Sequence, residues 1–205
     1  MPLVFGASSD SSNLDIPTSL LFNRGHDNKL TFTPGSAGAT AERQKFTVSC
    51  WVKRCNLGGA AVQYLWEMGG NDNANERIFA RFSADDSLRV ADSGTVFRET
   101  GRKFRDVSAW YHIVVAFDTT QGTAGDRVKV YVNGVQETVF ATSNNPGQND
   151  QKGFSHNSEH TIGRSGVDDT LSFDGYMANF DAVGGAQLTP GNFGKTDTNG
   201  QWIPI

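Results

Sequence analysis

The segment from Asp126 to Val139, DRVKVYVNGVQETV, limits the possible folds of this chain more than any other stretch. Its first half alternates apolar and polar residues, which is the period of a strand with one buried face. The apolar positions are Val128, Val130 and Val132. Asn133-Gly134 then tolerates positive φ at both centres of a type I′ turn, so the chain should fold straight back on itself. The sequence therefore predicts an antiparallel hairpin.

A two-residue turn also fixes which residues of the hairpin face one another. The expected pairs are Val132 with Val135, Val130 with Glu137, and Val128 with Val139. Glu137 places a charge on an otherwise apolar face, so the hairpin should lie near an edge or rim of its sheet. Its outward residues form no catalytic set, and we interpret the hairpin as scaffold.

Several other segments alternate in the same way and are predicted strands. The longer ones are FTVSCWVK, RIFARFS, WYHIVVAFD and FDGYMANFD, and the shorter ones are SLLF, KLTF, YLWEM, LRV and HTIG. The expected apolar faces are Phe46, Val48, Cys50 and Val52; Ile78, Ala80 and Phe82; Tyr111, Ile113, Val115 and Phe117; and Tyr176, Ala178 and Phe180. Phe79 and Arg81 point the other way, and Trp51 falls on a polar face.

These strands predict an all-β fold of two packed antiparallel sheets. The chain has 205 residues, of which 23 are glycine, 14 phenylalanine and three methionine, a composition of many turns and aromatic strand interiors. The 3.6-residue helical period is not evident over any useful length, and the best helical candidate is one turn with Thr189 as cap and Pro190 in the first position. Residues 142–159, TSNNPGQNDQKGFSHNSE, are interpreted as a surface loop.

The predicted domain organisation is an N-terminal arm over residues 1–18 and one domain over residues 19–205. The opening MPLVFGASSDSSN has too short an apolar run for a signal peptide, and no membrane-spanning stretch follows. Cys50 and Cys55 point to opposite faces of an extended strand, so a disulfide between them is not expected. The net charge of −4 argues against nucleic acid or an anionic membrane as partner.

Five of these segments in order, FTVSCWVK, WYHIVVAFD, VKVYVNG, HTIG and FDGYMANF, resemble the laminin-G-like branch of the concanavalin A-like lectin and glucanase superfamily. The resemblance extends from Ser19 to about Thr189, and it implies a two-sheet antiparallel jelly-roll sandwich. The opening MPLVFGASS and the closing GYMANFDAVGGAQLTPGNFGKTDTNGQWIPI are also similar to segments of tailed-bacteriophage virion proteins. The resemblance does not by itself imply a sugar ligand.

We expect no enzymatic activity, since the carboxylates lack the required pattern. Glucanases of this superfamily carry a Glu-x-Asp-x-x-Glu strand, which is missing here. Asp85-Asp86 and Asp168-Asp169 are interpreted as solvated turn acids, Glu67 has no partner at the right offset, and His112 is interpreted as structural. A cleft with two carboxylates about 5 to 9 Å apart would instead support a glucanase.

A carbohydrate-binding site is the more plausible local function. Trp51, on a polar strand face, and Trp66 offer aromatic faces for stacking on a sugar, and Asn71, Asp72 and Asn73 offer hydrogen bonds to its hydroxyls. The alternative for Trp51 is that it packs under a covering loop or a neighbouring protein.

Calcium is the one cofactor that the residue types suggest. Asn75 and Glu76, with Asp168 and Asp169, supply the oxygen ligands that calcium prefers, and related laminin-G-like domains often hold calcium at a sheet rim. The alternative is that both segments are ordinary polar turns, because neither has the glycine and distal glutamate of an EF-hand loop.

The resemblance to phage proteins implies a structural role in a virion. Leu3, Val4 and Phe5 would then be an apolar anchor that docks on other virion proteins. We therefore predict a non-enzymatic tail appendage, fibre or surface decoration protein, assembled in the host cytoplasm, with a lectin-like domain for cell-surface glycans. Self-association into a homo-oligomer is left open. The alternative is a free carbohydrate-binding module.

Overall fold

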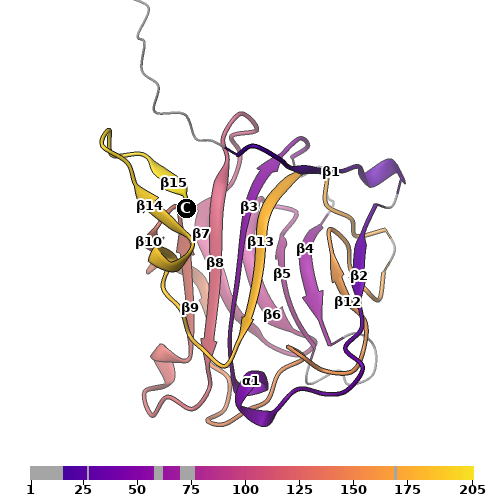
Figure 1. The fold of residues 1–205 in the computed structure, drawn as a ribbon, viewed down its shortest axis with the longest axis vertical. Helices are drawn as coiled ribbons and strands as arrows, with labels where there is room; N and C mark the ends of the chain where they lie inside the picture. The colour runs from indigo at the N-terminus through magenta and orange to yellow at the C-terminus, as the bar shows by residue number, and fades with distance from the viewer. Residues whose placement is uncertain (1–15, 27, 58–61, 70–76, 169) are drawn as a thin grey trace, which may run out of the picture.

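The computed structural model describes the chain except for residues 1–15, 27, 58–61, 70–76 and 169. It forms two antiparallel sheets stacked face to face, with short helical turns at the ends (Figure 1). The all-β jelly-roll prediction is confirmed. No helix among the described residues is long and apolar enough to cross a membrane. The boundary between arm and domain at residue 19 stays a prediction, because most of the arm lies outside the described residues.

The first sheet has six strands in the order β1-β13-β3-β8-β9-β10. Their bounds are β1 Leu20–Phe22, β13 Gly175–Gly184, β3 Lys45–Arg54, β8 Tyr111–Asp118, β9 Val128–Val132 and β10 Val135–Gln136. The second sheet has seven strands in the order β11-β7-β6-β5-β4-β12-β2. Their bounds are β11 Phe140–Ser143, β7 Val96–Lys103, β6 Ser87–Asp92, β5 Ile78–Phe82, β4 Gln63–Met68, β12 His160–Ile162 and β2 Leu30–Phe32.

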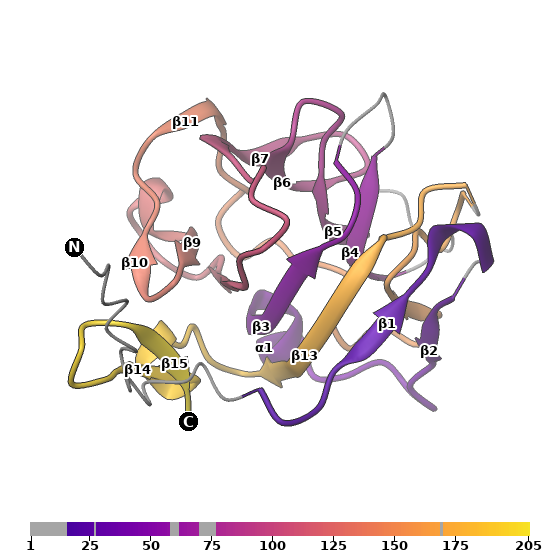
Figure 2. The ribbon, with the colours of Figure 1, turned by 90° about the horizontal axis from the view of Figure 1, so that it is seen from above.

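A separate two-stranded ribbon, β14 (Gly194–Thr196) with β15 (Trp202–Pro204), follows the last long strand. Seen from above, this ribbon lies on the side of the six-stranded sheet that faces away from the seven-stranded sheet (Figure 2). The helical turns are η1 (Arg24–His26), α1 (Thr40–Gln44), η2 (Ala124–Asp126) and η3 (Pro190–Asn192). The turn predicted after Leu188 is η3, where the Thr189 backbone N–H donates to Asn192 Oδ1 at 3.3 Å.

The core between the sheets contains the apolar faces that alternation predicted for β3, β5, β8 and β9. The prediction for β13 is wrong, because Met177 packs in the core while Tyr176 and Ala178 do not. A bulge between Ala178 and Asp181 inserts one extra residue opposite β3, and Asn179 adopts φ 45° there. Beyond an extra residue the side chains change faces, so Phe180 returns to the core.

The hairpin has the predicted turn and register at its closed end. Asn133 and Gly134 have φ of 49° and 80°, Val132 pairs with Val135, and the Glu137 N–H donates to the Val130 carbonyl. β10 is an edge strand, as expected, and Glu137 is buried in an ion pair with Arg102 of the other sheet, 2.8 Å away.

The predicted pairing of Val128 with Val139 is wrong. Val139 leaves the sheet and is 70% exposed. The Val128 carbonyl instead accepts a hydrogen bond at 2.9 Å from Nη2 of Arg98, a buried residue of β7. The hairpin therefore ends where a side chain from the opposite sheet satisfies its backbone.

The predicted surface loop at 142–159 is partly an interior element. Its first two residues belong to β11, and Phe154 stacks on Phe46 with ring centroids 4.8 Å apart. Lys152 is buried and pairs with Asp92 at 3.0 Å. The loop thus closes one end of the sandwich. Cys50 and Cys55 are both free, as expected.

Gly134 gives a direct test of how the turn supports the ribbon. A Cβ at this position would lie 2.5 Å from the Trp202 ring and would require a left-handed backbone. We predict that Gly134→Ala lowers the free energy of unfolding by about 2 to 5 kcal/mol, the sum of backbone strain and overpacking. Denaturant unfolding monitored by tryptophan fluorescence would measure this.

Gly185→Ala is the matched control. Gly185 has the same φ of 80°, but a Cβ there meets nothing within 4 Å. This variant should lose about 1 to 2 kcal/mol, the cost of strain alone. Equal losses in the two variants would contradict a supporting contact between the turn and Trp202.

Candidate functional site

Trp51 is not available to stack on a sugar. It is 2% exposed and lies on the outer face of the six-stranded sheet, where its ring stacks on His112 at 4.9 Å. Phe193 and Trp202, after β13, pack on His112, and Trp51 borders a hollow of about 430 Å³ beneath this segment, so the alternative of packing under a covering segment is the one observed. The predicted sugar-stacking role of Trp51 is therefore corrected.

Trp66 is also unavailable, since it is fully buried in the core between the sheets. A bulge between Tyr64 and Trp66 adds one residue to β4 opposite β5. As a result Leu65 and Trp66 both turn inward, which simple alternation does not foresee. The sugar-binding prediction for this residue is corrected as well.

The other predicted ligands are largely outside the described residues. Asn71, Asp72, Asn73, Asn75, Glu76 and Asp169 all lie there, as do Leu3, Val4 and Phe5. Asp168 is exposed, and its carboxylate accepts hydrogen bonds from the Thr170 hydroxyl at 2.7 Å and N–H at 2.9 Å, which lower its pKa. Within the described part of the chain no group of three potential metal ligands gathers. Calcium binding stays a prediction.

The covered face of the six-stranded sheet contains a buried hydrogen-bond chain. Trp202 Nε1 donates to His112 Nδ1 at 2.9 Å, and His112 Nε2 lies 2.9 Å from Ser49 Oγ. Because Nδ1 accepts, the neutral imidazole must carry its proton on Nε2 and donate it to Ser49. Burial lowers the pKa of His112 to about 4. His112 is thus a structural residue, as predicted.

The outer face of the seven-stranded sheet is different, because its polar side chains form a regular grid. Tyr64 of β4 is opposite Arg81 of β5, Arg81 is opposite Arg89 of β6, and Arg89 is opposite Glu99 of β7. In the next row Phe79 is opposite Ala91. Arg77, just before β5, continues the alternation of Phe79 and Arg81. Three arginines, Arg77, Arg81 and Arg89, therefore share this face with the rings of Tyr64 and Phe79.

The rings support the guanidinium groups of β5. The Tyr64 and Phe79 centroids are 5.0 Å apart, and the Arg81 guanidinium lies 5.3 Å from each. The Arg77 guanidinium lies 4.9 Å from the Phe79 centroid. These are cation–π distances, and they hold both guanidinium groups over the sheet. The rings themselves are buried, so this face presents guanidinium groups rather than an aromatic platform.

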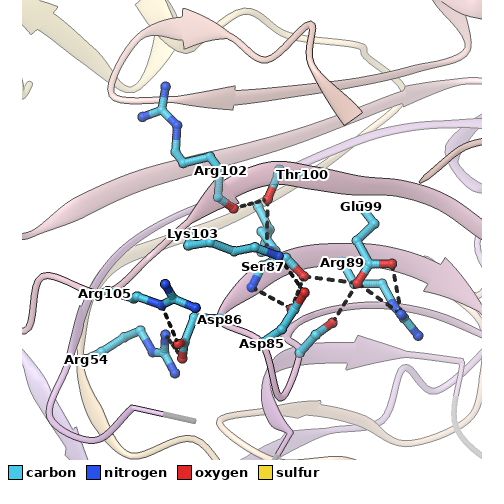
Figure 3. Close-up of polar contacts among 12 residues, drawn as sticks. Arg54, Asp85, Asp86, Ser87, Arg89, Glu99, Thr100, Arg102, Lys103 and Arg105 are labelled. Carbon is cyan, nitrogen blue, oxygen red and sulfur yellow. Dashed lines mark hydrogen bonds and ion pairs between the residues drawn. The ribbon is translucent and has the colours of Figure 1, made fainter. Parts of the chain in front are cut away.

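Two of the three arginines have carboxylate partners. Arg77 donates to the buried Glu67 at 2.6 Å. Arg89 donates to both oxygens of Glu99 at 3.0 and 2.9 Å, as Figure 3 shows. Burial acts to raise the pKa of Glu99, but hydrogen bonds from Arg89, Ser87 and Ser83 outweigh it and the pKa is lowered. Arg81 makes a hydrogen bond to the Tyr64 hydroxyl at 3.2 Å and no ion pair with any described residue.

Figure 3 also shows that Asp86 is not a solvated turn acid. It is buried between Arg54 and Arg105, at 2.9 and 3.0 Å, and has φ 67°. The fully buried Arg54 requires this carboxylate, because an unpaired buried charge is very unfavourable. Asp85 is exposed and accepts hydrogen bonds from Ser87 and Lys103. The interpretation of Asp86 as a solvated acid is corrected.

A pocket of about 280 Å³ opens over the grid. Its floor is Tyr64, Phe79 and Ala91, and one wall is the turn from Asp92 to Val96. Asp92 Oδ1 shapes that turn by accepting from the backbone N–H groups of Gly94 and Thr95. The pocket is thus polar, concave and built on paired strands, which is the setting that holds site residues most precisely.

A second hollow lies at the open side of the sandwich, near β2 and β12. It measures about 360 Å³ and is lined largely by apolar side chains such as Phe32, Phe154 and Phe180. Beside it, the edge strands β1 and β2 expose Leu20, Leu21, Leu30 and Phe32, the last at 65%. Such a surface is typical of a protein contact rather than of a sugar site.

The sequence placed Phe79 and Arg81 on one face but did not predict the pocket over the grid, which we call the arginine pocket after Arg77, Arg81 and Arg89. The available signal was the R-x-F-x-R spacing at residues 77 to 81, which aligns two cations and a ring on one side of a strand. The contribution of Arg89 and Tyr64 required the register between strands.

Comparisons with known proteins agree with this architecture. The family described as "Concanavalin A-like lectin/glucanases superfamily" matches residues 24–189. The chain belongs to this superfamily. Residues 190–205, which contain η3, β14 and β15, lie beyond the match. No curated protein sequence matches the chain.

Among solved structures, the chain is similar to domain 4 of the GH43 arabinanase AbnA from Geobacillus stearothermophilus, in complex with arabinotriose. The TM-score is 0.54 at 20% identity, covering 83% of this chain and 72% of that one. A SAP-like pentraxin from Limulus polyphemus gives 0.52 at 16% identity, covering 78% and 71%. The CBM40 of a Ruminococcus gnavus sialidase, bound to sialyllactose, gives 0.52 at 12% identity, covering 80% and 95%. At these identities the likeness establishes a lectin-like fold.

The buried His112 predicts a pH dependence of stability. Its pKa in the folded chain, about 4, lies below the ordinary value of 6.5. Between these values the unfolded chain binds a proton that the folded chain does not, so stability falls as the pH drops through this range. The loss should approach about 1.4 kcal/mol per pH unit, as measured by denaturant unfolding at several pH values.

His112→Gln is the comparison for this effect. The variant should be less stable at neutral pH, yet lose less on acidification. Part of the dependence should remain, because burial also lowers the pKa of His160. An unchanged slope in the variant would contradict the assignment to His112.

Proposed function

We propose that this domain is a non-enzymatic carbohydrate-binding module whose site is the pocket over Tyr64, Phe79 and Arg81. The observation that carries the proposal is a concave polar pocket, built on four paired strands, in a chain of a lectin superfamily. Two of the similar solved structures, the arabinanase domain and the CBM40, carry a sugar according to their descriptions. Strand-borne hydrogen-bonding groups at a fixed spacing suit the fixed hydroxyl pattern of a sugar ring.

The proposed lack of catalysis has support in the buried serine–histidine pair of the six-stranded sheet. Ser49 and His112 are 2.9 Å apart, which is the geometry of an activated serine. The Trp202 N–H, however, holds the imidazole proton on Nε2, so His112 donates to Ser49 and cannot accept its proton. In the arginine pocket, Glu67 and Glu99 are engaged by Arg77 and Arg89.

We also propose that the domain is part of a tailed-phage virion. There it serves as an appendage or surface component that engages host glycans. The support is the resemblance of the chain's opening and closing segments to virion proteins, and the exposed apolar side chains of the edge strands β1 and β2. The alternative is a free carbohydrate-binding module. A virion component should copurify with particles at fixed stoichiometry, and its absence from purified particles would remove this setting.

Blocking the pocket tests the binding function. Ser93 is exposed on the pocket wall, so Ser93→Trp should fill the entrance without disturbing the paired strands. On a glycan array followed by calorimetry, we expect the wild type to bind at least one glycan and the variant to bind it about tenfold or more weakly, because a steric block excludes the ligand.

Thr123→Trp is the control for this variant, since Thr123 is exposed on the loop before η2 and does not line the pocket. It should bind like the wild type. Equal binding by the wild type and Ser93→Trp would move the site elsewhere on the domain, and no binding to any glycan would remove the proposed function.

A further inference from the structure

We propose that the arginine pocket selects acidic sugars, with Arg81 and Arg89 receiving the carboxylate of a uronic or sialic acid unit. This inference rests on the proposed carbohydrate-binding function and names the ligand class of the same site. It follows from three features of the pocket: its charge balance, its unused hydrogen-bond donors and its rigidity.

One of the three arginines of the pocket has no acidic partner among the described residues. Arg77 is offset by Glu67, Arg89 by Glu99, and the wall residue Asp92 by Lys152. Arg81 has no acidic partner among the described residues, and it is directly opposite Arg89 in the strand register. Like charges in directly opposed positions destabilise a sheet. An anion bound at Arg81 would offset this remaining charge.

The arginines also retain hydrogen-bond donors. Arg77 and Arg89 make their carboxylate contacts through Nη2, and Arg81 contacts the Tyr64 hydroxyl through Nη1. Arg77 Nη1, Arg81 Nη2 and Arg89 Nη1 form no hydrogen bond to described residues, and they are not among the buried unpaired atoms. Planar guanidinium donors match a carboxylate, which can accept two parallel hydrogen bonds.

The guanidinium groups of the pocket are fixed in position before a ligand binds, although their buried nitrogen atoms disfavour folding. The Nε atoms of Arg77, Arg81 and Arg89 are all buried and have no hydrogen-bond partner among the described residues. Each such group is unfavourable for folding, because a buried donor without a partner has lost its hydrogen bonds to water. The rings of Tyr64 and Phe79 fix the guanidinium orientation, which reduces the entropy lost on binding.

The pocket favours a single acidic sugar unit over a polyanion. Its volume of about 280 Å³ is small, and only one cation in it is uncompensated by the described residues. The whole chain carries a net charge of −4, which would repel nucleic acid. Ser93 and Thr95 on the wall can bond the hydroxyls of the same sugar.

The test compares acidic glycans with their neutral counterparts by calorimetry on the full chain. The probe pairs are sialyllactose against lactose, and oligogalacturonate against its methyl ester. We expect the acidic member of at least one pair to bind at least about tenfold more tightly, as for other charge-assisted hydrogen bonds, and the binding to weaken as salt is raised.

Substitutions at Arg81 assign the effect. Arg81→Gln should reduce affinity for the acidic glycan about tenfold or more, and Arg81→Lys should retain part of it, because the charge remains but the planar fork is lost. Lys129→Gln on the other sheet makes the same change in net charge and should bind like the wild type. Thermal unfolding of each variant shows whether it is folded.

The outcomes separate the two proposals. Equal affinity for acidic and neutral members, in a protein that binds glycans, would overturn the acidic-sugar inference and leave the binding function intact. Loss of acidic-glycan affinity in Lys129→Gln equal to that in Arg81→Gln would overturn the role of Arg81. Binding to no glycan at all would overturn the carbohydrate-binding function and the inference together.

Discussion

The contact on which the rest of this structure depends is the layer of apolar side chains between β3, β8 and β9 of one sheet and β4, β5 and β6 of the other. Phe46, Val115, Phe82 and their neighbours are buried there almost completely. Because strand side chains alternate, burying one set fixes which residues point outward on each sheet. The outer faces, and any function on them, are therefore determined by the packing of the core.

The outer faces of the two sheets differ in what lies over them. On the six-stranded sheet, the segment that contains Phe193 and Trp202 lies over His112, and a hollow of about 430 Å³ lined by Ser49, Trp51 and Phe193 remains beside it. On the seven-stranded sheet, the corresponding positions carry arginines over Tyr64 and Phe79, and a pocket remains above them. The covering segment lies beyond the residues that match the superfamily, so superfamily membership does not predict that this face is covered.

The sequence predicted the regular part of this fold and little of the site. Alternation correctly assigned the faces of β3, β5, β8 and β9, and the Asn133-Gly134 turn set the hairpin register. It failed at Tyr176 and Ala178 of β13, where a bulge inserts one extra residue, and a bulge in β4 likewise turns Trp66 into the core. Val96–Lys103 (β7) was missed because its charged residue Arg98 is buried by hydrogen bonds to partners distant in sequence, such as the Val128 carbonyl. The exposure of Trp51 was predicted wrongly because the segment that covers it is far away in the sequence and adjacent only in the folded chain.

The arginine grid allows the surface charge of such a domain to change between related chains without a change of fold. Its described polar groups come from neighbouring positions of paired strands, and the strands themselves make the backbone hydrogen bonds. A single substitution at residue 81 or 89 alters the charge offered to a ligand without altering any backbone hydrogen bond of the ladder. Under the proposed binding function, binding preference can therefore diverge between related chains one position at a time, while the sandwich underneath stays the same.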